Sequence, residues 1–595
     1  MANLSGLLPA DPPGRIRFFY GLLIGVIVIF GLQLFYLQII RYSHYKAAAL
    51  SDQLKQYSIP ATRGLIEAED GTNIVPIVLN QKIYTLFSDP PFIKHPMKVA
   101  DQISKIIGGN PNSYIPALTI KGTQYAVIAH QLTQAQSDAI NKLQDPGLGT
   151  QGLDSRTYPD GDLAAQVLGF VNNNGVGVYG IEQALNKQLS GTPGKLKAIT
   201  DVRGVPLAAS RQNTQIAPIP GKNVVLTLNL GIQEQVQQII ARDYKTTKSQ
   251  GISAIVMNPY DGHIKAMANY PTYNPANYQN VTNVNLFDNN AVDYPIEPGS
   301  IMKTLTTSAA LDSGAITPNE SFYDPAHWVI NGFNIHDIKI DGGPRQQNIQ
   351  SILALSLNTG ATWMLMQMSH KGGTTINSKG IKTWHDYMVN HFRLGQPTGI
   401  QQGYEASGYV PPPNMNDPSI NLRYANTAFG QGVSMTALQI GTALSSVLNG
   451  GTYYQPSLVH EYINPTTGKA RIEQPKILER NVVKPNIGPE LVPLLEGVVK
   501  AYYQGGFSFM NFPSNYIVGG KTGTAQVARP TGGYYRNIYN GTYIGFVGGN
   551  KPKYVIVVYN IKPNVPGYAG SYGGQPVFAD IAHMLINEGY VSPKG

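Results

Sequence analysis

A long apolar run near the amino terminus limits what this chain can be more than any other feature. Residues 18–40 carry no charge, and a helix of this length, rising 1.5 Å per residue, crosses the roughly 30 Å hydrocarbon layer of a bilayer. Arg15 and Arg17 precede the run, so the positive-inside rule predicts that residues 1–17 form a cytoplasmic tail. The sequence therefore predicts a single-pass protein of the cytoplasmic (inner) membrane whose remaining residues are extracytoplasmic.

A cleaved signal peptide is the alternative interpretation of this run. Ala47, Ala48 and Ala49 offer small residues of the kind found at cleavage sites. The apolar part of a signal peptide is only about 7–15 residues long, and this run is longer, which favours a retained anchor. No second apolar stretch of that length follows in the sequence, so we expect one transmembrane helix.

Composition narrows the remaining possibilities. A chain of 595 residues exceeds one ordinary hydrophobic core, which predicts two or more domains. The net charge of +9 is dispersed and is not interleaved with stacking aromatic residues, which argues against nucleic-acid binding. Because the chain has no cysteine, disulfides, thiolate metal sites and cysteine nucleophiles are excluded. The scattered histidines fit ordinary polar or packed positions, and we expect neither a metal nor an organic cofactor.

Turn residues divide the rest of the chain into two parts. Residues 41–220 alternate short apolar runs with Gly, Pro and Asn turns and contain helix-like stretches at 96–107 and 132–143. We expect an extended α+β pedestal, because no catalytic constellation shows in this part of the sequence. Two prolines and a glycine within 216–221 favour extended backbone and mark the main boundary, so that residues 221–595 form the second domain.

The second domain begins and ends with strand signals around a helical middle. An Asp-Gly pair tolerates the positive φ of a tight hairpin turn, and strands at both ends predict one antiparallel β-sheet flanked by helices. The fold class is therefore α+β. The expected elements are a strand at 224–229, a helix at 232–244, a hairpin turning at 260–262, strands at 543–549 and 554–561, and a terminal helix from about Pro576.

The first candidate for chemistry is the run EPGSIMKTL at 297–305. Residues three apart share one face of a helix, so Lys303 is expected beside the hydroxyl of Ser300 and could accept its proton. The same spacing recurs at Ser43 and Lys46, which we interpret as the surface of a juxtamembrane helix because nothing else in the chain pairs with them. Ser-x-x-Lys alone is therefore weak evidence for a nucleophile.

A second motif, Ser-x-Asn, follows about fifty residues later at Ser356 and Asn358. A hydroxyl can relay a proton and an amide can orient a substrate amide, although both residue types are also favoured as helix caps. Ser419 and Asn421 repeat the spacing after a proline-rich loop. We favour Ser356 because it lies on an apolar helical framework.

The third motif, Lys-Thr-Gly, occurs once, within GGKTGTAQ at 519–526. Lys521 beside Thr522 and Thr524 predicts an anion site, and Gly523 would let a substrate backbone approach closely. A glycine-rich turn without a chemical role is the alternative interpretation.

The three motifs in this order resemble those of penicillin-binding proteins and class A β-lactamases. The resemblance is to class B penicillin-binding proteins, which are monofunctional peptidoglycan DD-transpeptidases, and it covers nearly the whole chain beyond residue 15. The run around the second motif is more similar to septal, FtsI-like division enzymes than to elongation enzymes of cell shape. Further matches are Arg63-Gly64 before Asp70-Gly71; Arg156, Tyr158 and Pro159; Gly180 to Glu182; and Phe429-Gly430-Gln431-Gly432 before Thr436.

This resemblance implies a serine acyl-enzyme mechanism. Ser300 would attack the penultimate D-alanine of a stem peptide, with Lys303 as the base, and an amine of a neighbouring stem peptide would then attack the ester. Burial and the like charge of Lys521 would keep the base neutral. β-Lactams would mimic the donor and stay attached. The implied roles are proton transfer by Ser356, amide binding by Asn358, carboxylate binding by Lys521, Thr522 and Thr524, and an oxyanion hole from the N–H groups of Ser300 and Thr524.

The resemblance also implies a partner, because no glycosyltransferase domain precedes the pedestal. Glycan polymerisation would come from a multi-pass membrane polymerase, together with other wall-synthesis or division proteins. Ile301-Met302 and Leu357 depart from the usual family residues at positions that bear on substrate or antibiotic preference. Two alternatives stay open: a hydrolase of the DD-carboxypeptidase or β-lactamase kind, and a non-catalytic scaffold or β-lactam sensor. The Glu-x-x-Leu-Asn segment of β-lactamases is not found after Ser356.

Overall fold

The structure, a computed structural model, describes residues 14–46, 54–199, 214–337 and 344–595. Residues 1–13 of the predicted tail and the alanines at 47–49 lie outside these ranges. The chain forms two compact units. One comprises Met1–Ala61 with Thr192–Ile219, and the other comprises Thr62–Gly191 with Pro220–Gly595.

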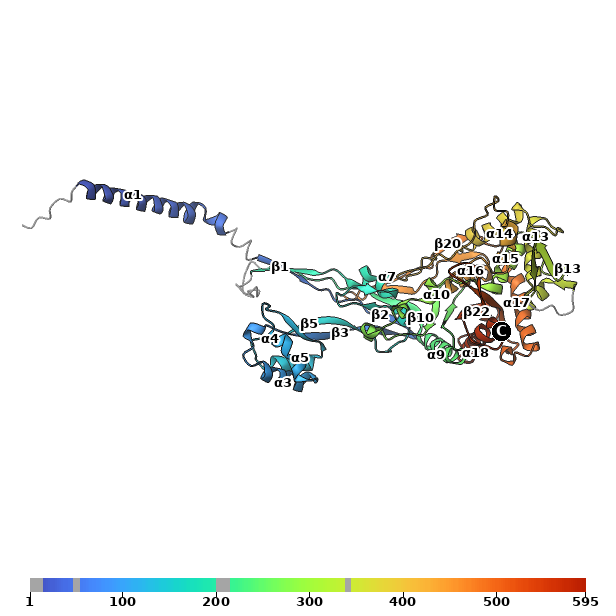
Figure 1. The fold of residues 1–595 in the computed structure, drawn as a ribbon, viewed down its shortest axis with the longest axis horizontal. Helices are drawn as coiled ribbons and strands as arrows, with labels where there is room; N and C mark the ends of the chain where they lie inside the picture. Colours follow the sequence, from blue (N-terminus) through green and yellow to red (C-terminus); the bar gives the residue numbers. More distant parts are fainter. Residues whose placement is uncertain (1–13, 47–53, 200–213, 338–343) are drawn as a thin grey trace, which may run out of the picture. The chain divides into compact units, whose positions relative to one another are not determined.

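The first unit contains the apolar run as one helix, α1 (Gly14–Phe35), which continues into a π-helical turn, η1 (Tyr36–Ile40) (Figure 1). Its large apolar side chains are exposed along the whole length, an arrangement that suits a lipid environment rather than water. Within the part of the chain that the structure describes, this is the one helix long and apolar enough to cross a membrane. The same unit holds an antiparallel sheet of β1 (Leu54–Ile59), β8 (Gly194–Ile199) and β9 (Thr214–Ile216).

The second unit begins with strands of a seven-stranded sheet. Strand β3 pairs antiparallel with β2, β4 and β5, and helices α3, α4 and α5 bury their apolar faces, including Val99, Ile103 and Ile140, in one separate core. The predicted helix at 96–107 is confirmed, and the one at 132–143 is shorter because β4 reaches Leu132. The bounds are β2 (Ile66–Asp70), β3 (Asn73–Ser88), α3 (Pro96–Ile107), α4 (Ile115–Thr119), β4 (Ala126–Leu132), α5 (Gln134–Asn141) and β5 (Leu148–Thr157).

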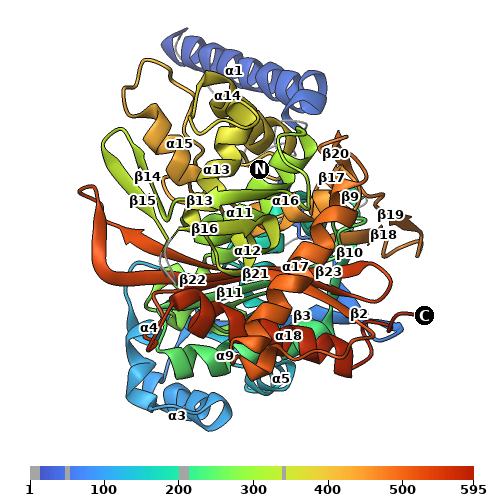
Figure 2. The same ribbon diagram turned by 90° about the vertical axis from the view of Figure 1, so that its right-hand side faces the viewer.

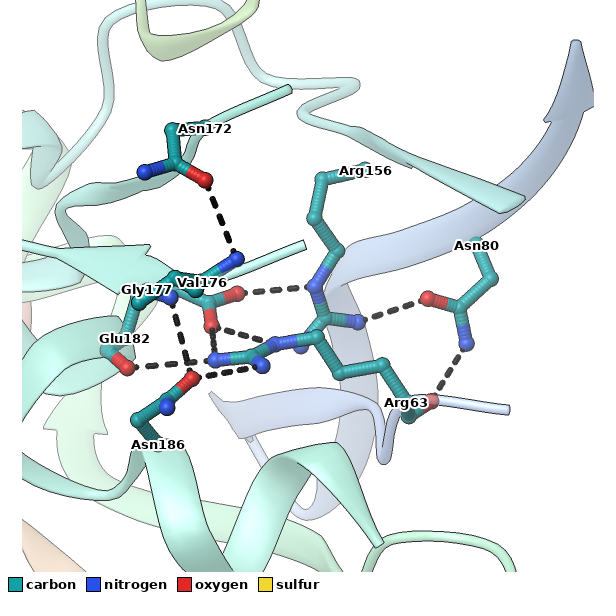
Figure 3. A network of polar contacts seen from close by, with 8 residues as sticks. All are labelled: Arg63, Asn80, Arg156, Asn172, Val176, Gly177, Glu182 and Asn186. Atoms are coloured by element: carbon teal, nitrogen blue, oxygen red, sulfur yellow. Dashed lines mark hydrogen bonds and ion pairs between the residues drawn. The ribbon is translucent and has the colours of Figure 1, made fainter. Parts of the chain in front are cut away.

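A buried ion network joins segments of this unit that are far apart in the sequence (Figure 3). The carboxylate of Glu182 is fully buried; one oxygen accepts hydrogen bonds from Nε and Nη2 of Arg63, and the other accepts one from Nε of Arg156 at 2.8 Å. Nη1 of Arg63 donates a hydrogen bond to the side-chain oxygen of Asn186 at 2.9 Å. Nη1 of Arg156 donates one to the side-chain oxygen of Asn80, also at 2.9 Å. Arg63, Arg156 and Glu182 belong to the further motifs that carry the family resemblance, and the structure brings all three into one cluster.

We expect Glu182→Gln to lower the free energy of unfolding by about 3–5 kcal/mol, because it leaves two buried guanidinium groups without their counter-charge. Glu473→Gln is the matched control: its carboxylate pairs with Arg471 at 2.6 Å where both side chains are exposed, and the expected loss is below about 1 kcal/mol. Denaturant unfolding of the detergent-solubilised full-length chain measures both. Equal midpoints for the two variants would show that the network does not stabilise the fold.

A five-stranded antiparallel sheet forms the centre of the remaining chain, in the order β12-β11-β23-β22-β21. The predicted hairpin is confirmed, as is the pairing of strands from both ends of the domain. The bounds are β10 (Asn223–Asn229), α9 (Leu230–Thr247), β11 (Gly251–Met257), β12 (Ile264–Tyr270), β21 (Ile517–Ala528), β22 (Tyr534–Gly548), β23 (Pro552–Ile561) and α18 (Gln575–Asn587).

Helices cover both faces of this sheet, because alternate strand residues point to opposite sides (Figure 2). Ile252, Ala254 and Val256 pack in one core with α9 and α18, whereas Ile255 and Met257 belong to another with the helical middle. The middle comprises α10 (Asn290–Asp293), α11 (Met302–Asp312), α12 (Ile349–Ala354), α13 (Asn358–Ser369), α14 (Ser378–Asp386), α15 (Ile420–Ala428), α16 (Ala437–Leu448) and α17 (Ile487–Gln504). The fold is α+β, as predicted.

Candidate active site

Ser300 lies in a 3₁₀ turn, η6 (Gly299–Ile301), that leads directly into α11. Gly299 has a φ of +60°, and a Cβ at this position would lie 2.7 Å from the carbonyl oxygen of Thr524 on β21. Glycine is therefore required for the turn to pack against the strand. The close packing places Ser300 beside the Lys-Thr-Gly strand, with 9% of its surface exposed.

The amino group of Lys303 is the centre of the cluster. Its Nζ lies 2.9 Å from Oγ of Ser300, 3.2 Å from Oγ of Ser356 and 2.8 Å from Oδ1 of Asn358. It also donates to the carbonyl of Ser356 at 2.7 Å. The structure thus joins the first two motifs through one nitrogen atom.

Burial shapes the charge of this amine. Lys303 is fully buried, and desolvation, reinforced by the like charge of Lys521, holds its pKa well below that of an ordinary lysine; the carboxylate of Asp337 opposes this shift. Both causes of the lowered pKa agree with the sequence-based expectation. A neutral amine has a lone pair, so the Ser300 hydroxyl can donate its proton along the 2.9 Å contact.

The backbone of the second motif has a positive φ at Ser356. Ser356 connects α12 to α13 with a φ of +61°, a conformation that costs a non-glycine residue of order 1–3 kcal/mol. Asp337 secures the start of α13: its carboxylate accepts the N–H of Asn358, and the N–H and Oγ1–H of Thr359 at 3.1 and 2.8 Å. Asp337 was not anticipated from the sequence, because it lies in a segment without a motif.

The third motif occupies β21, where Lys521 is fully buried. Its Nζ donates to the carbonyl of Thr522 at 3.1 Å and to the hydroxyl of Tyr502 at 3.2 Å. Burial lowers the pKa of Lys521 to about 7. Thr524 accepts the N–H of Gly570 at 3.0 Å through its hydroxyl oxygen. Tyr502, on α17, was not anticipated from the sequence.

The structure shows a packing role for Gly523 in addition to the substrate-binding role expected from the sequence. A Cβ there would lie 2.2 Å from Oγ1 of Thr542 and 2.6 Å from the carbonyl oxygen of Pro298. The side of Gly523 toward which a Cβ would point is therefore filled by the protein itself. Glycine is needed at this position because the Ser300 turn packs directly against the strand.

A cavity of about 440 Å³ opens beside these groups. Ser300, Ser356, Thr522 and Thr524 line it together with Tyr502. Lys303, Asn358, Lys521 and Gly523 are not among its lining residues; the two lysines are fully buried and Asn358 is partly buried. The arrangement combines a serine hydroxyl, an amine whose pKa is lowered by burial, and hydroxyl donors at one cavity, which suits acyl transfer from an anionic amide or ester.

Comparisons with known proteins agree with this geometry. Residues 252–583 match the family model described as the penicillin-binding protein transpeptidase domain, and residues 58–226 match that of the penicillin-binding protein dimerisation domain. The chain is 28% identical to stage V sporulation protein D of Bacillus subtilis, covering 98% of this chain and 87% of that protein. It is 27% identical to the peptidoglycan D,D-transpeptidase FtsI of Buchnera aphidicola subsp. Schizaphis graminum, covering 95% and 94%.

A solved structure extends the likeness to a ligand complex. Penicillin-binding protein 3 of Mycobacterium tuberculosis, complexed with ampicillin, is 26% identical to this chain, covers 90% of it and 97% of itself, and superposes with a TM-score of 0.66. The two chains therefore share their fold over most of their lengths.

Proposed function

The chain belongs to the class B penicillin-binding proteins, and from this premise we propose that it is a peptidoglycan D,D-transpeptidase whose nucleophile is Ser300. One observation carries the proposal: Nζ of a buried lysine with a depressed pKa lies 2.9 Å from the serine hydroxyl, beside a cavity. Such a pair is an established alternative to Ser–His for activating a hydroxyl.

Acylation follows from the positions of these groups. Lys303 takes the proton of Ser300 while Oγ attacks the carbonyl carbon of the penultimate D-alanine, and the N–H groups of Ser300 and Thr524 are proposed to bind the oxyanion. The C–N bond then breaks, and terminal D-alanine leaves after its amine receives a proton through Ser356, whose Oγ is 3.2 Å from Nζ of Lys303. The product is an ester between Ser300 and the stem peptide.

Transfer completes the reaction. The amine of a second stem peptide attacks the ester, loses its proton to the Lys303–Ser356 pair, and forms the cross-linking amide as Ser300 regains its proton. We propose that Asn358 holds the donor amide, that Thr522 and Thr524 bind the donor carboxylate at the cavity wall, and that Lys521 supplies positive charge to this site from behind Thr522. A β-lactam would acylate Ser300 in the same way and remain bound as an ester.

The cellular assignment rests on the apolar helix and on the relatives. We propose residues 1–17 as a cytoplasmic tail, 18–40 as the anchor, 41–220 as the pedestal and 221–595 as the extracytoplasmic transpeptidase domain. The similarity to FtsI favours a role in septal wall synthesis during cell division. A multi-pass glycan polymerase in the same membrane is the proposed partner.

The group that receives the acyl chain, an acceptor amine or water, distinguishes a transpeptidase from a hydrolase. With a stem-peptide donor and an acceptor amine, we expect the full-length protein in detergent to release D-alanine and to form a cross-linked product that grows with acceptor concentration. Mass spectrometry of the products measures the partition. Release of shortened peptide to water at a rate that ignores the acceptor would assign a carboxypeptidase instead, and no acylation at all would favour a scaffold.

A further inference from the structure

The hydroxyl of Tyr502 contacts polar groups of both Lys521 and Thr522 in the third motif. Tyr502 is near the end of α17 and lines the same cavity as Ser300. Its oxygen is 3.2 Å from Nζ of Lys521, 2.9 Å from Oγ1 of Thr522 and 3.4 Å from the backbone nitrogen of Thr522. This phenol therefore shares the polar contacts of the Lys-Thr-Gly strand, although it comes from another element.

Lys521 reaches the cavity only indirectly. Its side chain is fully buried, and the described contacts of Nζ are the carbonyl and hydroxyl of Thr522 and the hydroxyl of Tyr502. Lys521 is not a lining residue, whereas both of its hydroxyl partners are. An anion in the cavity would thus meet the positive charge through Tyr502 and Thr522.

The phenol is equipped to donate. Burial raises the pKa of Tyr502, so its hydroxyl stays protonated at neutral pH. A hydroxyl that accepts a hydrogen bond from an ammonium group becomes a stronger donor, because successive hydrogen bonds polarise one another. With Lys521 donating to the phenolic oxygen, the phenolic proton is available to Thr522 or to an anion in the cavity.

We propose that Tyr502 belongs to the subsite that binds the carboxylate of the acyl donor, accepting a hydrogen bond from Lys521 and donating one to the carboxylate. The assignment rests on the proposed function, since it concerns the same cavity and reaction. Tyr502 acts beside Thr522 and transmits the charge of Lys521 to the ligand.

The test compares penicillin with its methyl ester on the full-length protein carrying Tyr502→Phe. The free acid has the carboxylate and the ester lacks it, so we expect the second-order rate constant of acylation to fall about 10- to 100-fold for the acid and to change little for the ester. The readout is the acid-to-ester ratio of rate constants, which does not depend on the fraction of folded protein. Tyr503→Phe, an exposed neighbour on the same helix, is the control and should keep the wild-type ratio.

Each outcome is informative. An unchanged acid-to-ester ratio in Tyr502→Phe, or an equal loss for both compounds, overturns the carboxylate subsite while leaving acylation at Ser300 intact. Failure of the wild-type protein to react with either compound overturns the proposed function, and this assignment with it. A ratio that falls only in Tyr502→Phe supports the subsite.

Discussion

The Ser300→Ala variant is expected to form no covalent adduct with penicillin and to make no cross-linked product. Alanine has no nucleophilic oxygen, and the ester between Ser300 and the acyl group cannot form without one. The side chain is small and lies at the cavity wall, so its loss should leave the fold intact. Gel detection of a labelled penicillin on the full-length protein measures the loss.

Ser43→Ala is the matched control for that experiment, because Ser43 and Lys46 repeat the spacing of the first motif. Ser43 and Lys46 lie on a short exposed helical segment after the long apolar helix, and we expect wild-type labelling of this variant. Labelling that persists in Ser300→Ala, or that is lost in Ser43→Ala, would remove Ser300 from the mechanism.

The Lys303→Met variant is expected to acylate on the order of 10²- to 10⁴-fold more slowly, which is the usual contribution of a general base. Methionine fills similar space, and replacing a buried amine by an apolar group need not destabilise the protein. Stopped-flow acylation by penicillin measures the rate, and Lys46→Met serves as the control with an unchanged rate.

The pH profile gives the same experiment a second readout. Only neutral Lys303 can accept a proton, so kcat/KM rises as pH increases through its pKa, and the depressed pKa moves this rise well below that of an ordinary lysine. Lys521, with a pKa of about 7, loses its charge above that pH, so carboxylate-bearing donors should react more slowly there. The profile is expected to be a bell in the wild type and to lack its rising limb in Lys303→Met; an unaltered bell would mean that another group is the base.

The elements that could be predicted from the sequence are those that depend on local patterns of residues. The apolar strands, the Asp-Gly hairpin and the long apolar helix are local patterns, and each element is found where the pattern placed it. The contact between Ser300 and Lys303 was predictable too, because a helix fixes the direction of side chains three residues apart. The distance from Lys303 to Ser356 was not, since it depends on how α11 packs beside the α12–α13 connection.

Groups that act through tertiary packing escaped prediction for the same reason. Asp337 and Tyr502 lie in segments without a motif, and only the folded chain brings them to Asn358 and Lys521. The packing role of Gly523 escaped prediction too, because Thr542 and the turn that carries Ser300 meet this glycine only in the folded chain.

The most direct test of the account is the site of a penicillin adduct on the wild-type, full-length protein. Intact mass spectrometry is expected to show the addition of one penicillin, and peptide mapping should place it on the peptide that contains Ser300. An adduct on any other peptide, or a protein whose mass stays unchanged after long exposure to penicillin, would contradict the assignment of Ser300 as the nucleophile.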